Sequence, residues 1–225
     1  MDKDSRNMIA EYGKSLFERR YCAGTAGNIS VRLDDERILV TPTNSCLGRL
    51  DPATLSVMNM NGEQLEGDKV SKEVGIHLAI YHQRPDCRAV LHLHSPYLTA
   101  LSCLENVDPD DAIRPFTPYF FMKVGRLPII PYFRPGSPLI AEAMASRLHT
   151  ENACLMANHG AVSLGASLSD AANWYEELEE TARLVFILSG KPIRYLSDDA
   201  LAELKSIRQK THPYQKLSSS PFMQK

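Results

Sequence analysis

The sequence predicts a single α/β domain in which helices cover a mixed β-sheet. Three observations predict this: helical stretches alternate with hairpins and single strands, no internal repeat or long linker interrupts them, and 225 residues suffice for one large core. We expect one domain over residues 1–215. The polar end LSSSPFMQK is typical of a frayed terminus, so residues 216–225 are expected to form a flexible tail.

The first elements follow from periodicity and turn residues. Residues 5–20 place apolar side chains on one stripe and predict an amphipathic helix. NISVRL and RILVTP are two predicted strands joined by the charged turn DDER. TLSVMNMNGEQLEG predicts a hairpin around Asn61-Gly62, the pair preferred in type I′ turns. Ser71 is expected to cap a helix, SKEVGIHLAIYHQRP, that Pro85 ends.

The later elements alternate in the same way. RAVLHLH predicts a strand and PYLTALSCL a helix that starts near Pro96. Residues 106–138 are rich in proline and predict mostly loop, with short strands such as LPIIPY. SPLIAEAMASRLH predicts a helix, and ACLMAN a strand that leads through the tight turn NHG into AVSLG. The last two predicted helices are SLSDAANWYEELEETARLVFILSG, with Gly190 as its C-cap, and LSDDALAELKSIRQK, capped by Ser197.

The composition is ordinary for a soluble globular protein, with 44% hydrophobic and 23% charged residues. A net charge of -2 and a pI near 6.4 give no general reason to expect nucleic acid or an anionic membrane as a partner. Five cysteines are scattered singly, which favours reduced thiols in a cytosolic protein. The start has no apolar signal region and no apolar run approaches ~18 residues, so a cytoplasmic location is expected.

Two histidines in an apolar strand are candidate metal ligands. His92 and His94 would point to the same face, where buried imidazoles need a partner for every ring nitrogen. His159, in the NHG turn, is a third candidate, and three histidines with an open position suit Zn²⁺ acting as a Lewis acid. The pair alone also fits packed core histidines, and His159 also fits a residue that tolerates a positive φ.

Other motifs add candidate chemistry. Glu73, in the first turn of its predicted helix, is a candidate acid/base, although an acidic residue there also simply favours the helix dipole. His77 lies one turn further on, where it would brace the helix or the site without being a ligand. The loops GTAGNIS, TPTNSCLG and GDKVSKE combine small residues, hydroxyl groups and exposed backbone amides, which bind anions. Each loop alone is also typical of an ordinary turn.

These motifs, in this order and spacing, resemble the class II aldolase/adducin family. The likeness runs from about residue 5 to about residue 205. It implies a three-layer α/β/α fold around a mainly antiparallel central sheet. It further implies a Zn²⁺ site, one ion per subunit, and a homotetramer with fourfold symmetry.

The resemblance also implies roles for individual residues. HLH and NHG match the zinc ligands, and Glu73 matches the acid/base, which can also ligate the resting metal. Lys72 departs from the serine that the aldolases more often carry, and its cation would help with a phosphate or a carboxylate. The implied residues are His92, His94, His159 and Glu73 for the metal, Glu73 for proton transfer, and Gly27, Asn28, Thr43, Asn44, Ser71 and Lys72 for the phosphate.

A closer likeness is to the 3-oxo-tetronate 4-phosphate decarboxylases, carried by IRPFTPYFFMKVGRLPIIPYFRPG, ANHG, EELEETARLVFIL and PIRYLS. It implies a carbon–carbon lyase that converts a four-carbon 3-keto acid phosphate into dihydroxyacetone phosphate and CO2 through a metal-stabilised enediolate. Tyr119 or Tyr132 would take the place of the aldolases' catalytic tyrosine. Arg114, Lys123 and Arg134 are further candidates for meeting the carboxylate, with a surface role as the plainer expectation for each.

Alternative functions remain open within and outside the enzyme class. A class II sugar-phosphate aldolase of the fuculose-phosphate type and a ribulose-phosphate 4-epimerase share the same motifs. The adducin head resembles this fold as an interaction module without the metal set. The presence of all three histidines and Glu73 argues against that module, and against a plain sugar-phosphate-binding protein.

Overall fold

The computed structural model describes residues 2–211, with side chains to residue 207. The predicted domain end at residue 215 and the predicted tail over 216–225 lie outside the described residues. The helices are α1 (Asp2–Glu18), α2 (Val74–Gln83), α3 (Pro96–Ser102), α4 (Pro118–Lys123), α5 (Pro138–Arg147), α6 (Leu168–Ile187) and α7 (Asp198–Thr211). The strands are β1 (Asn28–Arg32), β2 (Arg37–Val40), β3 (Ser56–Asn59), β4 (Gln64–Glu66), β5 (Ala89–Leu93), β6 (Ile129–Ile130), β7 (Ala153–Met156) and β8 (Gly160–Gly165).

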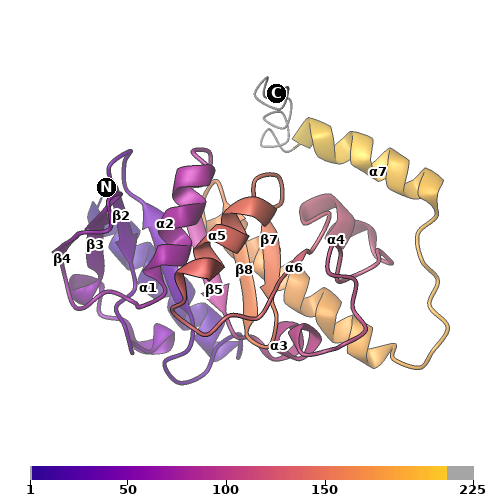
Figure 1. The fold of residues 1–225 in the computed structure, drawn as a ribbon, viewed down its shortest axis with the longest axis horizontal. Coiled ribbons are helices and arrows are strands. Elements are labelled where there is room, and N and C mark those ends of the chain that lie inside the picture. The colour runs from indigo at the N-terminus through magenta and orange to yellow at the C-terminus, as the bar shows by residue number, and fades with distance from the viewer. Residues whose placement is uncertain (1, 212–225) are drawn as a thin grey trace.

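One eight-stranded sheet organises the described part of the chain, in the order β4-β3-β2-β1-β5-β8-β7-β6 (Figure 1). Every neighbouring pair is antiparallel except β6 with β7, which is parallel. This confirms the mainly antiparallel sheet that the family resemblance implies. β5 lies inside the sheet, with β1 on one side and β8 on the other, so both of its edges are hydrogen bonded.

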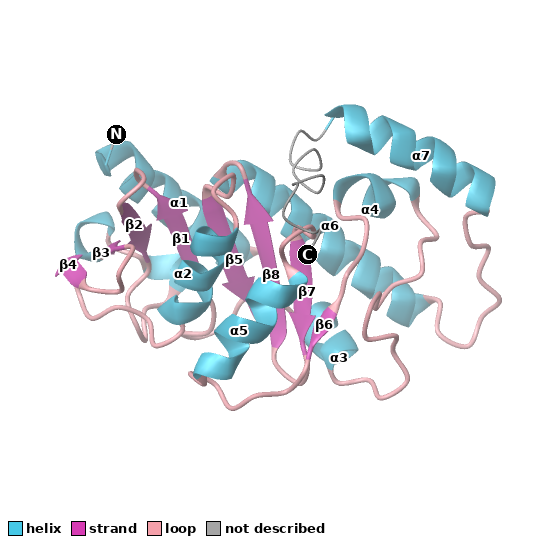
Figure 2. Ribbon diagram, turned by 45° about the horizontal axis from the view of Figure 1, so that its top comes forward, coloured by secondary structure: helices cyan, strands magenta, loops and turns pink. Residues whose placement is uncertain are grey.

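Helices cover both faces of the sheet, as predicted. Figure 2 shows α2 and α5 on one face and α6 on the other. The strand pleat alternates side chains between two apolar cores: Val90 joins the core under α2 and α5, whereas Leu91 and Leu93 join the core under α1, α3 and α6. All five residues of β5 are buried. The strand that carries His92 is therefore closed to solvent on both faces.

The helix that follows the GDKVSKE loop begins later than predicted. α2 starts at Val74 with Glu73 as its N-cap, so Ser71 is not the capping residue. Ser71 belongs instead to a preceding turn, in which the Val74 backbone N–H donates to the Ser71 carbonyl. This places Glu73 at the N-terminus of α2, with its carboxylate directed away from the helix and into the interior.

The predicted hairpin around Asn61-Gly62 is present between β3 and β4, but its turn is not type I′. Type I′ requires a positive φ at both central residues, whereas only Gly62 has one, at 90°. The side chain of Asn59 explains the difference. Its Oδ1 accepts the backbone N–H groups of Asn61 and Glu63, and so stabilises a wider turn.

The proline-rich segment 106–138 contains more regular structure than expected. It includes the short strand β6 and also α4, a helix that the proline count concealed because Pro118 sits at its first position, where proline is compatible with a helix. α7 packs against α4 and stands apart from the sheet in both views (Figures 1 and 2). Ser197 caps α7 as predicted, its hydroxyl accepting the Ala200 backbone N–H.

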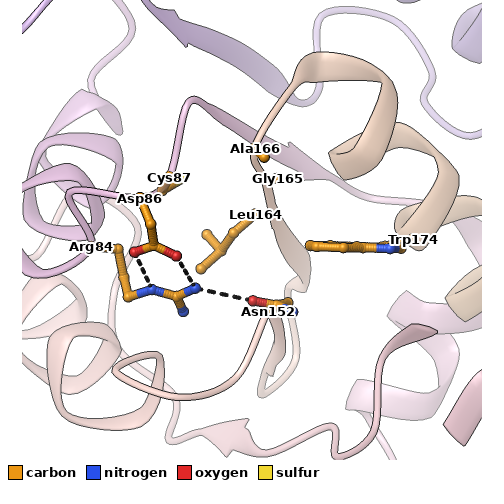
Figure 3. A pocket seen from close by; sticks show the side chains of 8 residues that line it. All are labelled: Arg84, Asp86, Cys87, Asn152, Leu164, Gly165, Ala166 and Trp174. Atoms are coloured by element: carbon orange, nitrogen blue, oxygen red, sulfur yellow. Dashed lines mark hydrogen bonds and ion pairs between the residues drawn. The ribbon is translucent and has the colours of Figure 1, made fainter. Parts of the chain in front are cut away.

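A buried arginine ties together the end of the sheet opposite to the histidines. Figure 3 shows the guanidinium of Arg84 bonded to the carboxylate of Asp86 and to the side-chain oxygen of Asn152. Its remaining donors reach the carbonyls of Leu148 and Glu151, at 3.0 Å each. With its donors used within the chain, this cluster joins the end of α2 to the segment between α5 and β7 and serves the fold.

The structure bears on membrane-spanning helices and on the state of the cysteines. Within residues 2–211 no helix is both long and apolar enough to cross a membrane. All five cysteines are free thiols, as predicted from their scattered positions.

Candidate metal centre

Three histidines converge at one end of β5. His92 is in the strand, His94 follows its last residue, and His159 lies in the turn between β7 and β8. The Nε2 atoms of His92 and His94 are 3.1 Å apart, and the three ring centroids are 4.7–4.9 Å from one another. One ligand nitrogen from each ring lies within 4.8 Å of the others. The structure thus brings together the three residues that the sequence singled out.

The turn that carries His159 is held against β5 by backbone packing. Leu93 pairs with Ala161 in the antiparallel register of β5 with β8, which brings the turn beside His94. Asn158 adopts a left-handed conformation, with φ of 56°. A Cβ at Gly160 would lie 2.5 Å from the Leu93 carbonyl oxygen, so only glycine fits there. Sheet register and one glycine therefore fix where His159 can lie.

The protonation of the histidines suits a metal ion. Nδ1 of His92 lies 3.0 Å from the Ala161 carbonyl, which can only accept, so the ring proton is on Nδ1 and Nε2 offers a lone pair toward the other rings. Burial, then repulsion from His92, lowers the pKa of His94 to about 4. The same causes lower the pKa of His159. Three imidazoles, in the neutral form in which they bind metals, are a donor set that fits Zn²⁺ with an open position.

Glu73 faces two of these rings from the α2 side. Its Oε1 is 3.5 Å from Nε2 of His159 and its Oε2 is 3.6 Å from Nε2 of His92. Asn28 Nδ2 donates to Oε2 over 2.9 Å. Burial raises the pKa of Glu73, but interactions with His92 and His159 and the Asn28 hydrogen bond outweigh burial and lower it below its ordinary value. The carboxylate is therefore ionised at neutral pH beside the histidines.

A cavity of about 410 Å³ opens in front of these groups. Gly27 forms part of its wall, with φ of 88°, and a Cβ there would lie 3.0 Å from the His92 carbonyl oxygen. Asn44 is also left-handed, with φ of 57°. His92 itself lies behind the wall and is fully buried. The predicted site residues that line the cavity are Gly27, Asn28, Thr43, Asn44, Ser71, Lys72, Glu73, His94 and His159.

Lys72 is the one lysine or arginine among the described residues that line this cavity. The other predicted carboxylate contacts lie elsewhere. Arg114 stacks on the Tyr195 ring with its Cζ 4.2 Å from the ring centroid, and Lys123 pairs with Glu177 over 3.1 Å. Arg134 does not line the cavity, although the next residue, Pro135, does. Within one chain, Lys72 is thus the cation placed to meet an anionic substrate.

Neither predicted tyrosine reaches the cavity in a single chain. Tyr119 is 63% exposed and Tyr132 is 61% exposed. Both side chains face away from the core, and neither lines the cavity. A catalytic role for either residue would require a second subunit that brings it to this site.

Glu179, on α6, holds the segment that directly follows His94, a role that was not predicted from the sequence. Its carboxylate accepts the Ser95 hydroxyl at 2.6 Å and the backbone N–H groups of Tyr97 and Leu98 at 2.9 Å each. It thereby caps α3 directly after His94. A signal was present in the sequence, because position 179 falls on the apolar stripe of a long helix, where a carboxylate needs a buried partner.

Comparison with known proteins gives concordant results. The family model described as Class II Aldolase and Adducin N-terminal domain matches residues 7–186. A 3-oxo-tetronate 4-phosphate decarboxylase of Haemophilus influenzae is 55% identical over 205 residues, 91% of this chain and 98% of that protein. The crystal structure of YgbL from Escherichia coli superposes with a TM-score of 0.89 at 50% identity, covering 91% of this chain and 99% of that one. An L-fuculose phosphate aldolase of Methanococcus maripaludis is 35% identical over 174 residues, 77% of this chain and 92% of that protein.

Proposed function

Because the chain belongs to the class II aldolase and adducin family, we propose that it is a metal-dependent lyase that decarboxylates a 3-oxo-tetronate 4-phosphate. The products are dihydroxyacetone phosphate and CO2. The observation that carries this proposal is the convergence of three imidazoles and one carboxylate at the inner end of a cavity whose wall also holds Lys72. The 55% identical decarboxylase supports the choice of substrate over the 35% identical aldolase.

We assign the metal to His92, His94 and His159, and Zn²⁺ is the ion that three neutral imidazoles suit best. A bound divalent ion supplies Lewis-acid stabilisation of negative charge that develops on the substrate's ketone oxygen. The chain's own contribution is to hold the three rings in one tautomer and orientation. The hydrogen bond from His92 to the Ala161 carbonyl and the capping of α3 by Glu179 support that role.

Glu73 is proposed as the acid/base and as an additional ligand of the resting metal. When the bond between C1 and C2 of the substrate breaks, CO2 leaves and its electron pair remains on C2 and the neighbouring ketone. Glu73, which is ionised in the resting site, takes up a proton from solvent water and delivers it to C2, which completes dihydroxyacetone phosphate. Its position across from His92 and His159, in the wall of the cavity, supports this role.

The remaining cavity residues are proposed to bind the substrate's far end. Gly27, Asn28, Thr43, Asn44 and Ser71 offer backbone amides and short polar side chains for the phosphate. Lys72 adds a cation for the phosphate or for the carboxylate. Binding energy gained there holds C2 in place for proton transfer.

The assay that tests the proposal compares two substrates on one zinc-loaded preparation. The protein is incubated with a 3-oxo-tetronate 4-phosphate and, separately, with fuculose 1-phosphate. We expect CO2 and dihydroxyacetone phosphate from the first, above the rate of spontaneous decarboxylation in a protein-free control. Lactaldehyde from the second with no enzymatic CO2 from the first would replace the decarboxylase with the aldolase. A protein without bound zinc and without either activity would favour the interaction module.

The assembly and the location are part of the same proposal. We propose a homotetramer with fourfold symmetry, located in the cytoplasm, with no nucleic-acid or membrane partner. Sedimentation equilibrium of the zinc-loaded protein tests the tetramer, and a monomeric mass would contradict it. A homotetramer would also give the exposed Tyr119 and Tyr132 a neighbouring subunit to reach.

A further inference from the structure

Behind Glu73, a continuous chain of hydrogen-bonded side chains runs from the cavity into the core. Asn28 Nδ2 donates to Glu73, and Asn28 Oδ1 lies 2.5 Å from His77 Nε2. His77 Nδ1 lies 2.7 Å from Ser30 Oγ, which lies 2.8 Å from the Tyr81 hydroxyl. His77, Ser30 and Tyr81 are 0%, 0% and 1% exposed, and none lines the cavity. The proposed reaction therefore uses none of these three side chains directly.

This row of hydrogen-bonded side chains forms because a strand and a helix present polar residues at the same interval. Asn28 and Ser30 are two residues apart on β1, a rise of roughly 6.6 Å along the strand. His77 and Tyr81 are four residues apart on α2, a rise of roughly 6 Å along the helix. The side chains therefore interleave, with Asn28 between Glu73 and His77 and Ser30 between His77 and Tyr81. Glu73, at the start of α2, lies at the cavity end of this row.

Only one assignment of donors and acceptors fits the hydrogen bonds between these side chains. An ionised carboxylate accepts and cannot donate, so Asn28 must turn its NH2 group toward Glu73. Its side-chain oxygen then faces His77, and Nε2 of His77 must carry the proton that this oxygen accepts. Glu73, which can only accept, thus sets the orientation of the Asn28 amide, and that amide sets the tautomer of His77.

The same reasoning extends to the inner end of the chain. Burial, then repulsion from His92, lowers the pKa of His77 to about 3, so the ring is neutral and has one proton. With that proton on Nε2, Nδ1 accepts from the Ser30 hydroxyl, and Ser30 in turn accepts from Tyr81. Burial holds the pKa of Tyr81 well above its ordinary value, which keeps the phenol proton in place.

A cluster that only filled the core would not need this order. Asn28 could then adopt either amide orientation, because the two differ by exchange of oxygen and nitrogen with little change in shape. In the reversed orientation two acceptors, Asn28 Oδ1 and Glu73 Oε2, would face each other. The ionised carboxylate and the proton on Nε2 of His77 both exclude that orientation. When Glu73 carries a proton it could also donate to Asn28 Oδ1, and His77 alone then keeps the amide in place.

We propose that His77 is a positioning residue: by donating its Nε2 proton to Asn28 it keeps the Asn28 amide turned toward Glu73 and so fixes the carboxylate beside the reacting carbon. This inference rests on the proposed role of Glu73. It assigns to a buried histidine outside the cavity a definite effect on proton transfer, exerted through one intervening side chain.

The ring protonation of His77 can be measured without substrate. In zinc-loaded protein with 15N-labelled histidine rings, NMR is expected to show a neutral His77 ring protonated at Nε2, with a slowly exchanging proton. Replacement of His77 by glutamine identifies the signal by its loss. Ser30→Ala is expected to shift the same signal, because Nδ1 loses its donor. An Nδ1–H tautomer in the unmodified protein would overturn the inference.

Kinetics then tests whether that proton matters. His77→Gln keeps a side-chain N–H that can donate to Asn28, whereas His77→Leu is of similar size and cannot. We expect His77→Leu to lower kcat roughly 10- to 100-fold at unchanged KM and zinc content, and His77→Gln to recover most of the loss. Equal losses in both variants would show a structural role only and would overturn the inference.

A pair of buried serines gives a matched control that does not depend on replacing the histidine. Ser30 and Ser163 are both 0% exposed on central strands, but Ser163 donates to the Ala171 carbonyl on the other face of the sheet. Ser30→Ala is expected to lower kcat, and Ser163→Ala to affect stability alone. Equal kcat values in the two variants would contradict the inference. If the unmodified protein shows no decarboxylation, the proposed function fails, and the tautomer measurement still decides the role of His77.

Discussion

Asn28 and His92 are direct partners in the antiparallel pairing of β1 with β5. This one register position brings the side chain that holds Glu73 next to a proposed metal ligand. A slip of one residue would turn each strand's side chains to the opposite face. The register of two central strands therefore sets the geometry between the acid/base and the metal ligands, and the predictions below depend on it.

Removal of one histidine should release the metal. His159→Ala leaves two imidazoles, and because the side chain lies in a turn at the cavity the fold should persist. We expect zinc affinity to fall more than roughly 100-fold, with loss of turnover. Elemental analysis after dialysis against a chelator measures the zinc that remains bound. His149→Ala, at an exposed histidine outside the site, is the control and should keep one zinc per chain. Full zinc content in His159→Ala would contradict the proposed ligand set.

Glu73→Gln should separate metal binding from proton transfer. The amide keeps the shape of the side chain and can still accept from Asn28, but it cannot carry the proton to C2. We expect zinc content to remain and kcat to fall roughly 10²- to 10⁴-fold. Glu63→Gln, on the exposed hairpin between β3 and β4, should change neither quantity. A Glu73→Gln enzyme with unreduced kcat would remove Glu73 from the acid/base role.

Lys72→Met should weaken substrate binding through the loss of one charged contact. A hydrogen bond to an ionised group contributes about 1.5–3 kcal/mol, so kcat/KM should fall roughly 10- to 150-fold. The loss should appear chiefly in KM, and steady-state kinetics measures it. Lys69→Met is the matched control, since Lys69 is exposed three residues upstream and does not line the cavity. Equal kcat/KM values for the two variants would place Lys72 outside the binding site.

Glu179→Ala should destabilise the protein more than a surface substitution does. It removes the acceptor of the Ser95 hydroxyl and of two backbone N–H groups, and leaves these donors buried. The expected loss is about 3–5 kcal/mol in the free energy of unfolding of the metal-free protein, measured with urea. Zinc affinity should also fall, because the capped segment begins directly after His94. The neighbouring Glu180, on the exposed side of α6, provides the control, and its replacement by alanine should change little.

The thiols should differ sharply in reactivity. Burial raises the pKa of Cys22 to about 11 and those of Cys87 and Cys154 to about 12, so these thiols stay protonated at pH 8. Cys103 is exposed. We expect one thiol to react with a disulfide reagent in the native protein at pH 8 and all five in urea. The Cys103→Ser variant should leave none reactive before unfolding, and a reactive thiol in that variant would refute the prediction.

Much of the fold could be predicted because local patterns decide it. The apolar stripe of α1 and the apolar strand β5 depend on neighbours within a few residues, and both were located to within a few positions. The start of α2 was misjudged because Ser71 is a favourable cap by type, whereas Glu73 occupies that position with its side chain turned into the site. Local propensity could not register this tertiary interaction.

The site was predicted in part, for the same physical reason. The spacing of His92 and His94 in an apolar strand marks them as candidate ligands in the sequence, and the structure brings His159 next to them. Glu179 reaches Ser95 across 84 residues, and His77 reaches Asn28 across 49, so neither contact has a local signature. Each residue was visible only as a polar side chain on an otherwise buried helix face. What it bonds depended on the packing of helix against sheet.

Because β5 lies inside the sheet, the cavity has one rigid wall, formed by paired strands, and another wall, formed by loops, whose residues can change more readily. The wall beneath the histidines is hydrogen bonded on both edges, so its amides should exchange with deuterium only when the whole sheet opens. The facing wall consists of loops that contribute residues such as Thr43, Asn44 and Lys72. Insertions and substitutions are tolerated more readily in loops than in paired strands. Selection for a new sugar acid can therefore act on the loops while the strand that supplies the metal ligands stays unchanged.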